Sequence, residues 1–288
     1  MSRLLLKTTI GPVEDDWHVG RFSRLAAHLA ALRAADGQPL YQVTARDRAQ
    51  NEAGDDVDLA AFAAGGFDQL WLFAVDVTGA LTETDAANIE AAQKAGRGVL
   101  LTRDHQDLGA CLTRLGDVGQ AQYFQTQNPD PDETRRRRDD IDTPTIDWPN
   151  YHSGANGDLQ AIEVPAPVHP IMRRASGEPL RHLPSHPHEG AVGIPAPLKA
   201  HSAIIAIGTS KATGARFNIA VAIDGPDRGR AVADSSFHHL CDYNWDPRLG
   251  RPTFVTEPPA DTVIRDPGLL ADTHRYVENI AAWLERRI

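Results

Sequence analysis

One segment, residues 70–75, limits the fold of this 288-residue chain more than any other. All six of its residues (LWLFAV) are apolar, so both faces of a strand built from it are apolar. Such a strand belongs at the centre of a parallel sheet, where helices cover both sides. Residues 4–9 and 98–102 contain further short apolar runs and predict two more buried strands.

Helical patterns alternate with these strands. Apolar residues recur at helical spacing over 22–33, over 82–96 and from Asp266 to the end of the chain. Thr82 and Asp85 form a capping-box pattern at the start of the second helix. Strand and helix thus alternate through the first ~115 residues, which predicts a three-layer α/β fold with a largely parallel central sheet.

The rest of the chain departs from this alternation. Residues 202–207, 217–223 and 230–233 predict closely spaced strands, so we expect part of the sheet to be antiparallel. Residues 116–197 are rich in Pro, Asp, Arg, His and Gly and have little periodicity. A stretch of this kind is typical of a functional insertion or of mobile loops. We therefore expect a single α/β domain, 1–288, with a loop-rich insertion at about 116–197.

Composition narrows the choice of partners. The formal net charge of −10 disfavours nucleic acid, because the phosphate backbone is also negative. No apolar stretch reaches the ~20 residues of a membrane span, and two cysteines do not make a disulfide framework. The sequence therefore predicts a soluble, cytoplasmic protein that takes a small-molecule substrate and has no membrane partner. A homo-oligomer stays open.

Ligands of such sheets bind beyond the carboxyl ends of the strands, and several polar segments follow predicted strands. Asp104 and His105 belong to a segment, 103–109, that comes directly after the strand at 98–102 and opens a helix. Both are candidate catalytic residues, as a general acid/base or as metal ligands. The alternative is that Asp104 caps the helix and that His105 packs against the loop.

A second polar segment, Ser185–Glu189, has the sequence SHPHE. Imidazoles and a carboxylate suit a divalent transition metal, which makes His186 and His188 candidate ligands of zinc or manganese. Alternate residues of an extended chain need not face one point. A polar pocket wall without metal, in which Ser185 and Glu189 contact substrate, therefore stays open, and so does a plain surface loop.

A third segment follows the last predicted strand and contains His238 and His239. Histidine is suited to proton transfer near neutral pH. We expect His238 to be catalytic, with Asp234 or Asp242 as the residue that could orient it, and we expect His239 to contact substrate. The alternative is that only one of the two adjacent histidines lies in the site. Cys241 is close enough for a Cys/His nucleophile, but burial as a small apolar residue is the favoured interpretation.

The loop after the first strand adds Asp16 and His18 as candidate substrate contacts, although its acidity also suits the start of a helix. The sequence contains no glycine-rich phosphate loop. Residues 208–211 (GTSK) follow a strand but lack the upstream glycine of such a loop, so we expect no nucleotide cofactor.

Three segments resemble ThuA-like proteins of the class I glutamine-amidotransferase-like superfamily: 67–73 (FDQLWLF), 95–105 (AGRGVLLTRDH) and 230–239 (RAVADSSFHH). The resemblance implies a flavodoxin-like sandwich, with Asp104 and His105 at the nucleophile elbow and His238 at the place of a later histidine. The elbow has no cysteine, so glutaminase activity is not expected. The ThuA-like family, named for trehalose utilisation, implies a carbohydrate-type substrate.

Two hypotheses of function follow. The first is a hydrolase- or lyase-type enzyme for a carbohydrate-like small molecule, in which His105 and His238 perform acid/base chemistry. These histidines could instead share a divalent metal with His186 or His188. The second hypothesis is a catalytically silent, amidotransferase-like protein that binds a ligand or a partner through the insertion.

Overall fold

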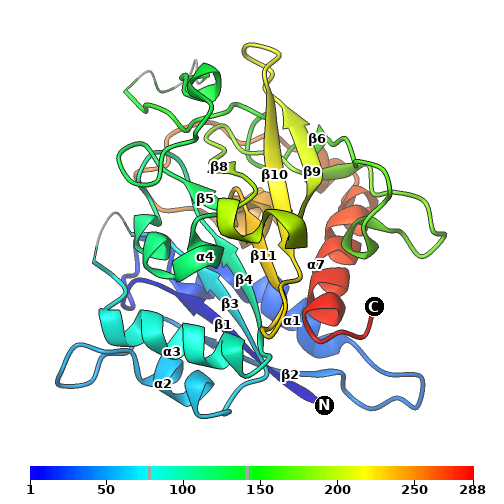
Figure 1. Cartoon of the computed structure of the whole chain (residues 1–288). Coiled ribbons are helices and arrows are strands. Elements are labelled where there is room, and N and C mark those ends of the chain that lie inside the picture. Colours follow the sequence, from blue (N-terminus) through cyan, green and yellow to red (C-terminus); the bar gives the residue numbers. More distant parts are fainter. Residues whose placement is uncertain (77–78, 140–142, 144) are drawn as a thin grey trace.

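The computed structural model describes residues 1–76, 79–139, 143 and 145–288. A seven-stranded sheet forms its centre, with the strand order β2-β1-β3-β4-β11-β10-β9 (Figure 1). The first five strands in this order are parallel, and β10 is antiparallel to both of its neighbours. The expected α/β fold with a largely parallel sheet is therefore confirmed. The strands are β1 Ser2–Thr8, β2 Tyr41–Arg46, β3 Gln69–Phe73, β4 Gly98–Thr102, β9 Ser202–Thr209, β10 Arg216–Ile223 and β11 Ala231–Asp234.

The central strands bury side chains on both faces of the sheet. Trp71 and Phe73 of β3 pack into one hydrophobic core, while Leu70 and Leu72 pack into the other. The side chains alternate because successive residues of a strand point in opposite directions. The apolar run thus supplies both cores at once, and each buried Leu or Phe contributes about 1.5–3 kcal/mol to stability.

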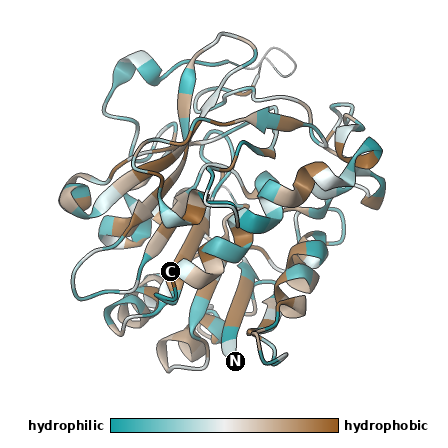
Figure 2. Cartoon of the chain, turned by 90° about the vertical axis from the view of Figure 1, so that its right-hand side faces the viewer, coloured by the Kyte–Doolittle hydropathy of each residue, from teal (hydrophilic) through white to brown (hydrophobic). Residues whose placement is uncertain are grey.

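Helices cover the two faces. α1 (Ser23–Ala31) and α7 (Ala271–Leu284) pack on the core that contains Trp71, and α2 (Val57–Ala63) and α3 (Glu83–Lys94) pack on the other. Figure 2 shows the apolar strands enclosed between more polar outer elements. The molecule is therefore a three-layer sandwich.

The predicted helix starts follow their capping patterns. Thr82 Oγ1 accepts the Asp85 backbone N–H at 3.0 Å, and the Asp85 carboxylate accepts the Thr82 N–H at 3.1 Å. At the end of the chain, Asp266 caps a 3-10 helix, η8 (Pro267–Leu270), and α7 begins only after it. The last α-helix is therefore shorter than its sequence pattern predicts.

The insertion at 116–197 is folded against the sheet. It contains α4 (Gly116–Gly119) and two small antiparallel pairs, β5 with β8 and β6 with β7. Its buried Tyr151, Ile171 and Leu183 join the core that α7 covers. Figure 1 shows much of the insertion, in green, across the end of the sheet away from the two chain termini. The four short strands are β5 Gln122–Tyr123, β6 Leu159–Ala161, β7 His182–Pro184 and β8 Ala191–Val192.

Short helical turns complete the fold. No helix in the described ranges is both long enough and apolar enough to span a membrane. The turns are η1 Val19–Phe22, η2 Ala110–Arg114, η3 Glu133–Arg135, η4 Pro170–Met172, η5 Ala196–His201, η6 Phe237–His239, α5 Asp242–Trp245, η7 Pro247–Leu249 and α6 Thr262–Arg265.

Candidate functional site

A cavity of about 520 Å³ opens beyond the carboxyl ends of the parallel strands. Its lining includes Ile10 after β1, Asp76 after β3, Asp104 after β4 and Phe237 after β11. The insertion and the loop at 254–257 supply the other walls. This is the place where parallel α/β sheets generally bind their ligands.

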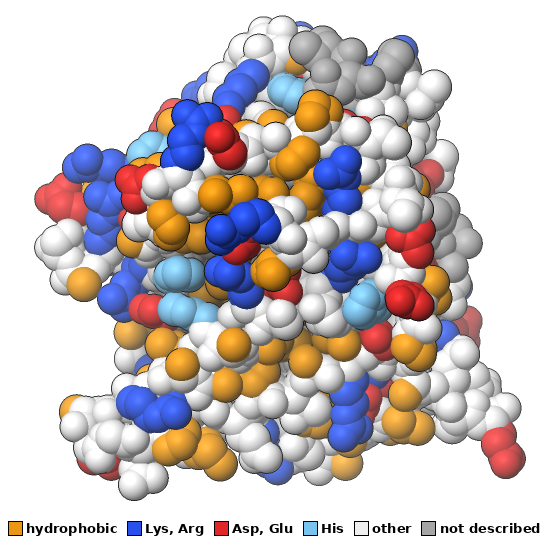
Figure 3. Space-filling view, turned by 180° about the vertical axis from the view of Figure 1, so that it is seen from behind, with side chains coloured by type: hydrophobic (Ala, Val, Ile, Leu, Met, Phe, Trp, Pro, Cys, Tyr) orange, Lys and Arg blue, Asp and Glu red, His pale blue; other side chains and the backbone are white. Residues whose placement is uncertain are grey.

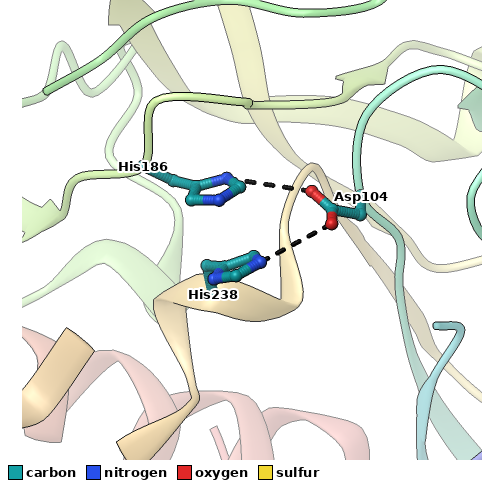
Figure 4. A group of neighbouring side chains, drawn as sticks. All are labelled: Asp104, His186 and His238. Atoms are coloured by element: carbon teal, nitrogen blue, oxygen red, sulfur yellow. Dashed lines mark ion pairs between the residues drawn. The ribbon is translucent and has the colours of Figure 1, made fainter. Parts of the chain in front are cut away.

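Three of the predicted residues, Asp104, His186 and His238, meet in this cavity (Figure 4). His186 Nδ1 lies 3.8 Å from Asp104 Oδ1, and His238 Nε2 lies 3.5 Å from Asp104 Oδ2. The atoms that the three residues could offer to a metal ion all lie within 4.8 Å of one another, and all three side chains are buried. Segments far apart in the sequence thus build one compact cluster, which we call the Asp104 cluster.

The two imidazole rings of the cluster are stacked, with centroids 3.5 Å apart and planes at 12°. Burial lowers the pKa of His186 well below its usual range, and it also lowers the pKa of His238 against the opposing effect of Asp104. Burial by itself would raise the pKa of Asp104, but His105 and His238 outweigh it and hold that pKa well below its usual range. The cluster therefore presents a carboxylate to neutral imidazoles, the protonation state that metal binding requires.

Short local motifs hold the two histidines. Ser236 caps η6 by accepting the His238 backbone N–H at 3.2 Å, and Asp234 accepts the Ser236 N–H at 3.1 Å. On the insertion, the His186 N–H donates to Ser153 Oγ at 2.8 Å. The Asp-Ser-Ser sequence that begins at the last residue of β11 thus turns the chain so that His238 faces the cavity.

Gly190 lets the insertion approach the ends of the strands. A Cβ atom at this position would lie 2.5 Å from the Ser235 carbonyl oxygen and 2.7 Å from the Asp104 carbonyl oxygen. The Gly190 N–H donates to the same Ser235 oxygen at 3.1 Å. A residue without a side chain is needed for this close contact of two backbones.

A second group of side chains lies beside the cluster. His105 Nδ1 lies 3.4 Å from Asp104 Oδ1, and the His105 ring is 5.3 Å from that of His188. His188 Nε2 pairs with Glu257 Oε1 at 3.1 Å, and this hydrogen bond is the main cause that lowers the pKa of Glu257 to about 2. Both His186 and His188 line the cavity although they alternate along the chain, because the segment does not run as a regular strand there.

Sequence reasoning missed two carboxylates of the cavity, Asp76 and Glu257. Asp76 directly follows the apolar run at 70–75, so the rule that ligands bind beyond strand ends could have identified it. Its Oδ1 accepts the Thr9 hydroxyl at 2.7 Å. Glu257 lies in a proline-containing loop with no local signal, and only tertiary packing brings it to His188.

Three predicted substrate contacts, Ser185, Glu189 and His239, do not line the cavity. Glu189 and His239 are fully buried, with His239 Nε2 at 3.0 Å from Glu189 Oε1 and its Nδ1 at 2.7 Å from Asp234 Oδ1. Burial alone would lower the pKa of His239, but the two carboxylates raise it to about 10. Here the structure corrects the prediction, because adjacent residues of a short turn point to different sides and only His238 reaches the cavity. The Ser185 side chain is also buried, and its backbone oxygen accepts Asn244 Nδ2 at 2.6 Å.

Of the two candidates after β1, Asp16 lines the cavity and His18 does not. Asp16 Oδ1 accepts the Trp17 N–H at 2.7 Å. His18 caps η1 instead, because its Nδ1 accepts the Gly20 N–H at 3.2 Å. The prediction that His18 contacts substrate is therefore wrong. His18 caps the start of a helix, which is the alternative that the sequence had left open for this loop.

The two cysteines, Cys111 and Cys241, are buried and unpaired. Burial raises the pKa of both thiols. Cys241 Sγ lies 3.9 Å from His238 Nδ1, but a thiol with a raised pKa is a poor nucleophile at neutral pH. The favoured interpretation of Cys241, as a small buried side chain, agrees with this environment.

No protein-family model matches this chain. No curated protein sequence matches it. Among solved structures, the chain is similar to the N-terminal domain of mmIFT52, with 10% sequence identity, a TM-score of 0.54 and coverage of 98% of this chain and 96% of that chain. At this identity the similarity shows the fold alone.

Two further solved structures are more distant. The glutaminase domain of CTPS from Trypanosoma brucei with bound acivicin has 15% identity, a TM-score of 0.46 and coverage of 99% of this chain and 94% of its own. A putative ThuA-like protein from Parabacteroides merdae has 12% identity, a TM-score of 0.41 and coverage of 81% and 78%. Both TM-scores are below 0.5, and the ThuA-like affiliation stays a prediction.

Proposed function

We propose that this protein is a small-molecule enzyme of the hydrolase or lyase type. The observation that carries the proposal is the convergence of Asp104, His186 and His238 on one buried point of a cavity of about 520 Å³. Buried titratable groups with shifted pKa values that meet in a cleft are characteristic of functional sites. The carbohydrate-like substrate rests on the ThuA-like segments, and the unpaired cysteines suit work in the reducing cytoplasm.

The Asp104 cluster has the composition of a metal site. Two ligand atoms that are each ~2.1 Å from a tetrahedral zinc ion lie about 3.4 Å apart. The imidazole nitrogens of the cluster lie 3.8 and 3.5 Å from the Asp104 oxygens. Asp104 Oδ1 is buried and has no hydrogen-bond partner in the described part of the chain. Two imidazoles and a carboxylate would hold zinc or manganese, and such an ion activates a bound water.

The stacked rings set a condition for metal binding. A nitrogen lone pair lies in the plane of its ring, whereas an ion midway between two nearly parallel rings lies outside both planes. One ion could therefore be bound by His186 and His238 together only if the angle between their ring planes became larger than the present 12°. If the rings stay stacked, the same residues perform acid/base chemistry without a metal.

His105 is the proposed proton carrier. It lines the cavity, its side chain is 17% exposed, and its Nδ1 faces Asp104 Oδ1. The nearby carboxylate attracts a proton to Nδ1 electrostatically, which favours proton exchange at the other ring nitrogen. His105 is thus placed to take a proton from an attacking water or to give one to a leaving group.

A catalytically silent binding protein is the second proposal. It is favoured by one observation, which is that the described lining of the cavity contains no serine or cysteine nucleophile. Such a protein would retain the cavity and the insertion for ligand or partner binding.

Zinc binding tests the metal site of the first proposal. We expect His186→Ala and His238→Ala each to weaken zinc binding by more than about 100-fold in calorimetric titrations, since loss of outer partners alone costs ~10–100-fold. His201→Ala is the matched control, because His201 is exposed and lies outside the cavity. Equal zinc affinity in all four proteins would reject the metal site.

A panel of sugar esters, lactones and glycosides then tests the chemistry. We expect His105→Ala to lower kcat on any substrate found by about 100-fold or more, because general acid/base groups contribute at least that much. Full activity of His105→Ala would remove this residue from the mechanism. Binding of panel members by the wild type with no turnover would favour the silent protein.

A further inference from the structure

We propose that the natural ligand of the cavity carries a positively charged amino group. The inference rests on the proposed function only in taking this cavity as the substrate site. Four carboxylates line it, those of Asp16, Asp76, Asp104 and Glu257, and no Lys or Arg stands among the lining residues that the structure describes. The basic side chains among these lining residues are the four histidines His105, His186, His188 and His238, so the cavity has no Lys or Arg charge to offset its carboxylates.

Several buried carboxylates elsewhere in the chain are paired with Lys or Arg, whereas the buried Asp242 accepts from the Ser23 hydroxyl and from backbone N–H groups. Lys7 Nζ lies 2.8 Å from Asp56 and 2.7 Å from Asp58, and Arg48 pairs with the fully buried Asp85 at 3.0 Å. Opposite charges are also neighbours on the surface, since Figure 3 shows Lys or Arg next to Asp or Glu at several places on one face. Unpaired buried charge is unfavourable, which explains this matching.

The cavity carboxylates are treated differently. Asp76 accepts from the Thr9 hydroxyl and from the Ala80 N–H at 3.2 Å, and Asp16 accepts from a backbone N–H. Glu257 accepts from the Thr143 hydroxyl at 2.9 Å and pairs with His188. These donors orient the carboxylates, but hydroxyl and backbone N–H groups leave the negative charge in place.

Asp104 Oδ1 is buried and accepts no hydrogen bond in the described part of the chain, since its neighbours His105 Nδ1 and His186 Nδ1 lie 3.4 and 3.8 Å away, and this oxygen is a second sign that the site takes a cation. A divalent ion in the Asp104 cluster would offset Asp104 and one further carboxylate. Negative charge would still remain in the cavity, and a low-dielectric cleft strengthens the field of such charges.

Aromatic side chains complete the site. Trp17 and Phe237 line the cavity with ring centroids 5.5 Å apart, and Phe254 lies at its mouth with 57% of its surface exposed. The face of the buried Phe237 is stacked on His238, so the exposed Phe254 is the ring that can offer a face to an ammonium group, and the carboxylates supply the opposite charge. A neutral sugar would leave the carboxylates unbalanced, and a phosphorylated or carboxylated ligand would be repelled.

Matched compounds that differ only in charge test the proposal. Glucosamine, glucose and glucuronate share one ring, and cyclohexylamine, cyclohexanol and cyclohexanecarboxylate repeat the comparison without a sugar. Binding is measured by ligand-observed NMR in the presence of a chelator. The chelator removes metal ions, so that an amine cannot bind by coordinating a metal. We expect the amine to bind at least about fivefold more tightly than the neutral member in a series, with the acid weakest.

Two charge-neutralising variants locate the effect. Asp16→Asn and Glu257→Gln should each weaken amine binding by about fivefold and reduce the preference for the amine over the neutral compound. Asp36→Asn, in an exposed loop, should bind as the wild type does. The proposal is overturned if an acid or a neutral compound binds as tightly as its amine, if no amine binds, or if both variants retain wild-type affinity. Because no turnover is measured, failure of the proposed chemistry leaves this result unaffected.

Discussion

His238 and His239 show how far two adjacent residues of one type can differ. His238 lies in the cavity against His186, where burial lowers its pKa. His239 lies between Glu189 and Asp234, which raise its pKa to about 10 against the effect of burial. The first is suited to exchange protons or bind a metal, and the second stays protonated in the interior at neutral pH. The surroundings of each ring, and not its sequence position, decide its role.

At the residue scale we predict that Glu189→Ala destabilises the protein by about 3–5 kcal/mol, the cost of breaking a buried ion pair. Glu189 accepts from Ser153 at 2.8 Å and from Gln160 at 2.6 Å in addition to its pairing with His239. The free energy of unfolding from urea denaturation measures the loss. Glu52→Ala, at an exposed position, is the control and should change it by less than about 0.5 kcal/mol. If Glu189→Ala also lowered the free energy of unfolding by less than about 0.5 kcal/mol, the buried ion pair between Glu189 and His239 would not be formed.

At the scale of elements, the turns after the strands carry the candidate site. β4 ends two residues before Asp104, and β11 leads through Ser236 into the 3-10 turn that presents His238. Because β4 and β11 are parallel neighbours, these two turns emerge at the same edge of the sheet. The insertion adds His186 to these two turns. Gly190 allows the backbone of the insertion to approach the backbone of Ser235 and Asp104 closely.

The cap of η6 gives a prediction for this scale. Ser236→Ala removes the acceptor of the His238 N–H and should cost about 1 kcal/mol of stability. It should also weaken zinc binding by about 10-fold, because a loosened turn no longer orients the imidazole. Thr82→Ala is the matched control, since Thr82 caps α3 away from the cavity and should lower stability alone. Unchanged zinc affinity in Ser236→Ala would show that the cap does not position His238.

At the scale of the whole molecule, the insertion is fastened to α7. Asn279 Nδ2 donates to the backbone oxygens of Ile171 and Arg173 at 2.9 and 2.8 Å, and Arg174 pairs with Asp272 at 2.6 Å. The His169 ring packs edge-on against Trp283 at 5.1 Å. The wall of the cavity that contains His186 is therefore held by the same helix that covers the sheet.

His169 makes this docking sensitive to acid. Burial lowers its pKa to about 4, with Arg230 and Arg173 acting in the same direction and Asp224 against it. The unfolded chain binds a proton on this imidazole below pH ~6.5, so stability is lost as the pH falls from about 6.5 to 4. Solvent at this partly exposed ring reduces the effect to the order of 1 kcal/mol.

Denaturation at neutral pH and at about pH 4.5 measures this prediction. His169→Asn keeps an acceptor for the Ile171 N–H and removes the titration, so its stability should fall less between the two conditions. An equal fall in variant and wild type would assign the acid sensitivity to other groups.

Much of this protein follows from local sequence alone. The apolar runs at 70–75 and 98–102 determine central strands because only a sheet covered on both sides buries them fully. The placement of Asp104, His105 and His238 at one end of the sheet follows from parallel strand topology. These features depend on neighbours in the sequence, which is why periodicity and capping patterns identify them.

Only the tertiary structure decided which polar side chains share the cavity. It brought His186, His188 and Glu257 together from the insertion and from a distant loop, and it turned Glu189 and His239 into the interior. The packing of segments far apart in the chain sets these contacts, and no local pattern encodes the side to which a residue in an irregular segment points. The sequence thus determined the sheet and the edge at which to look, and long-range packing determined the composition of the site.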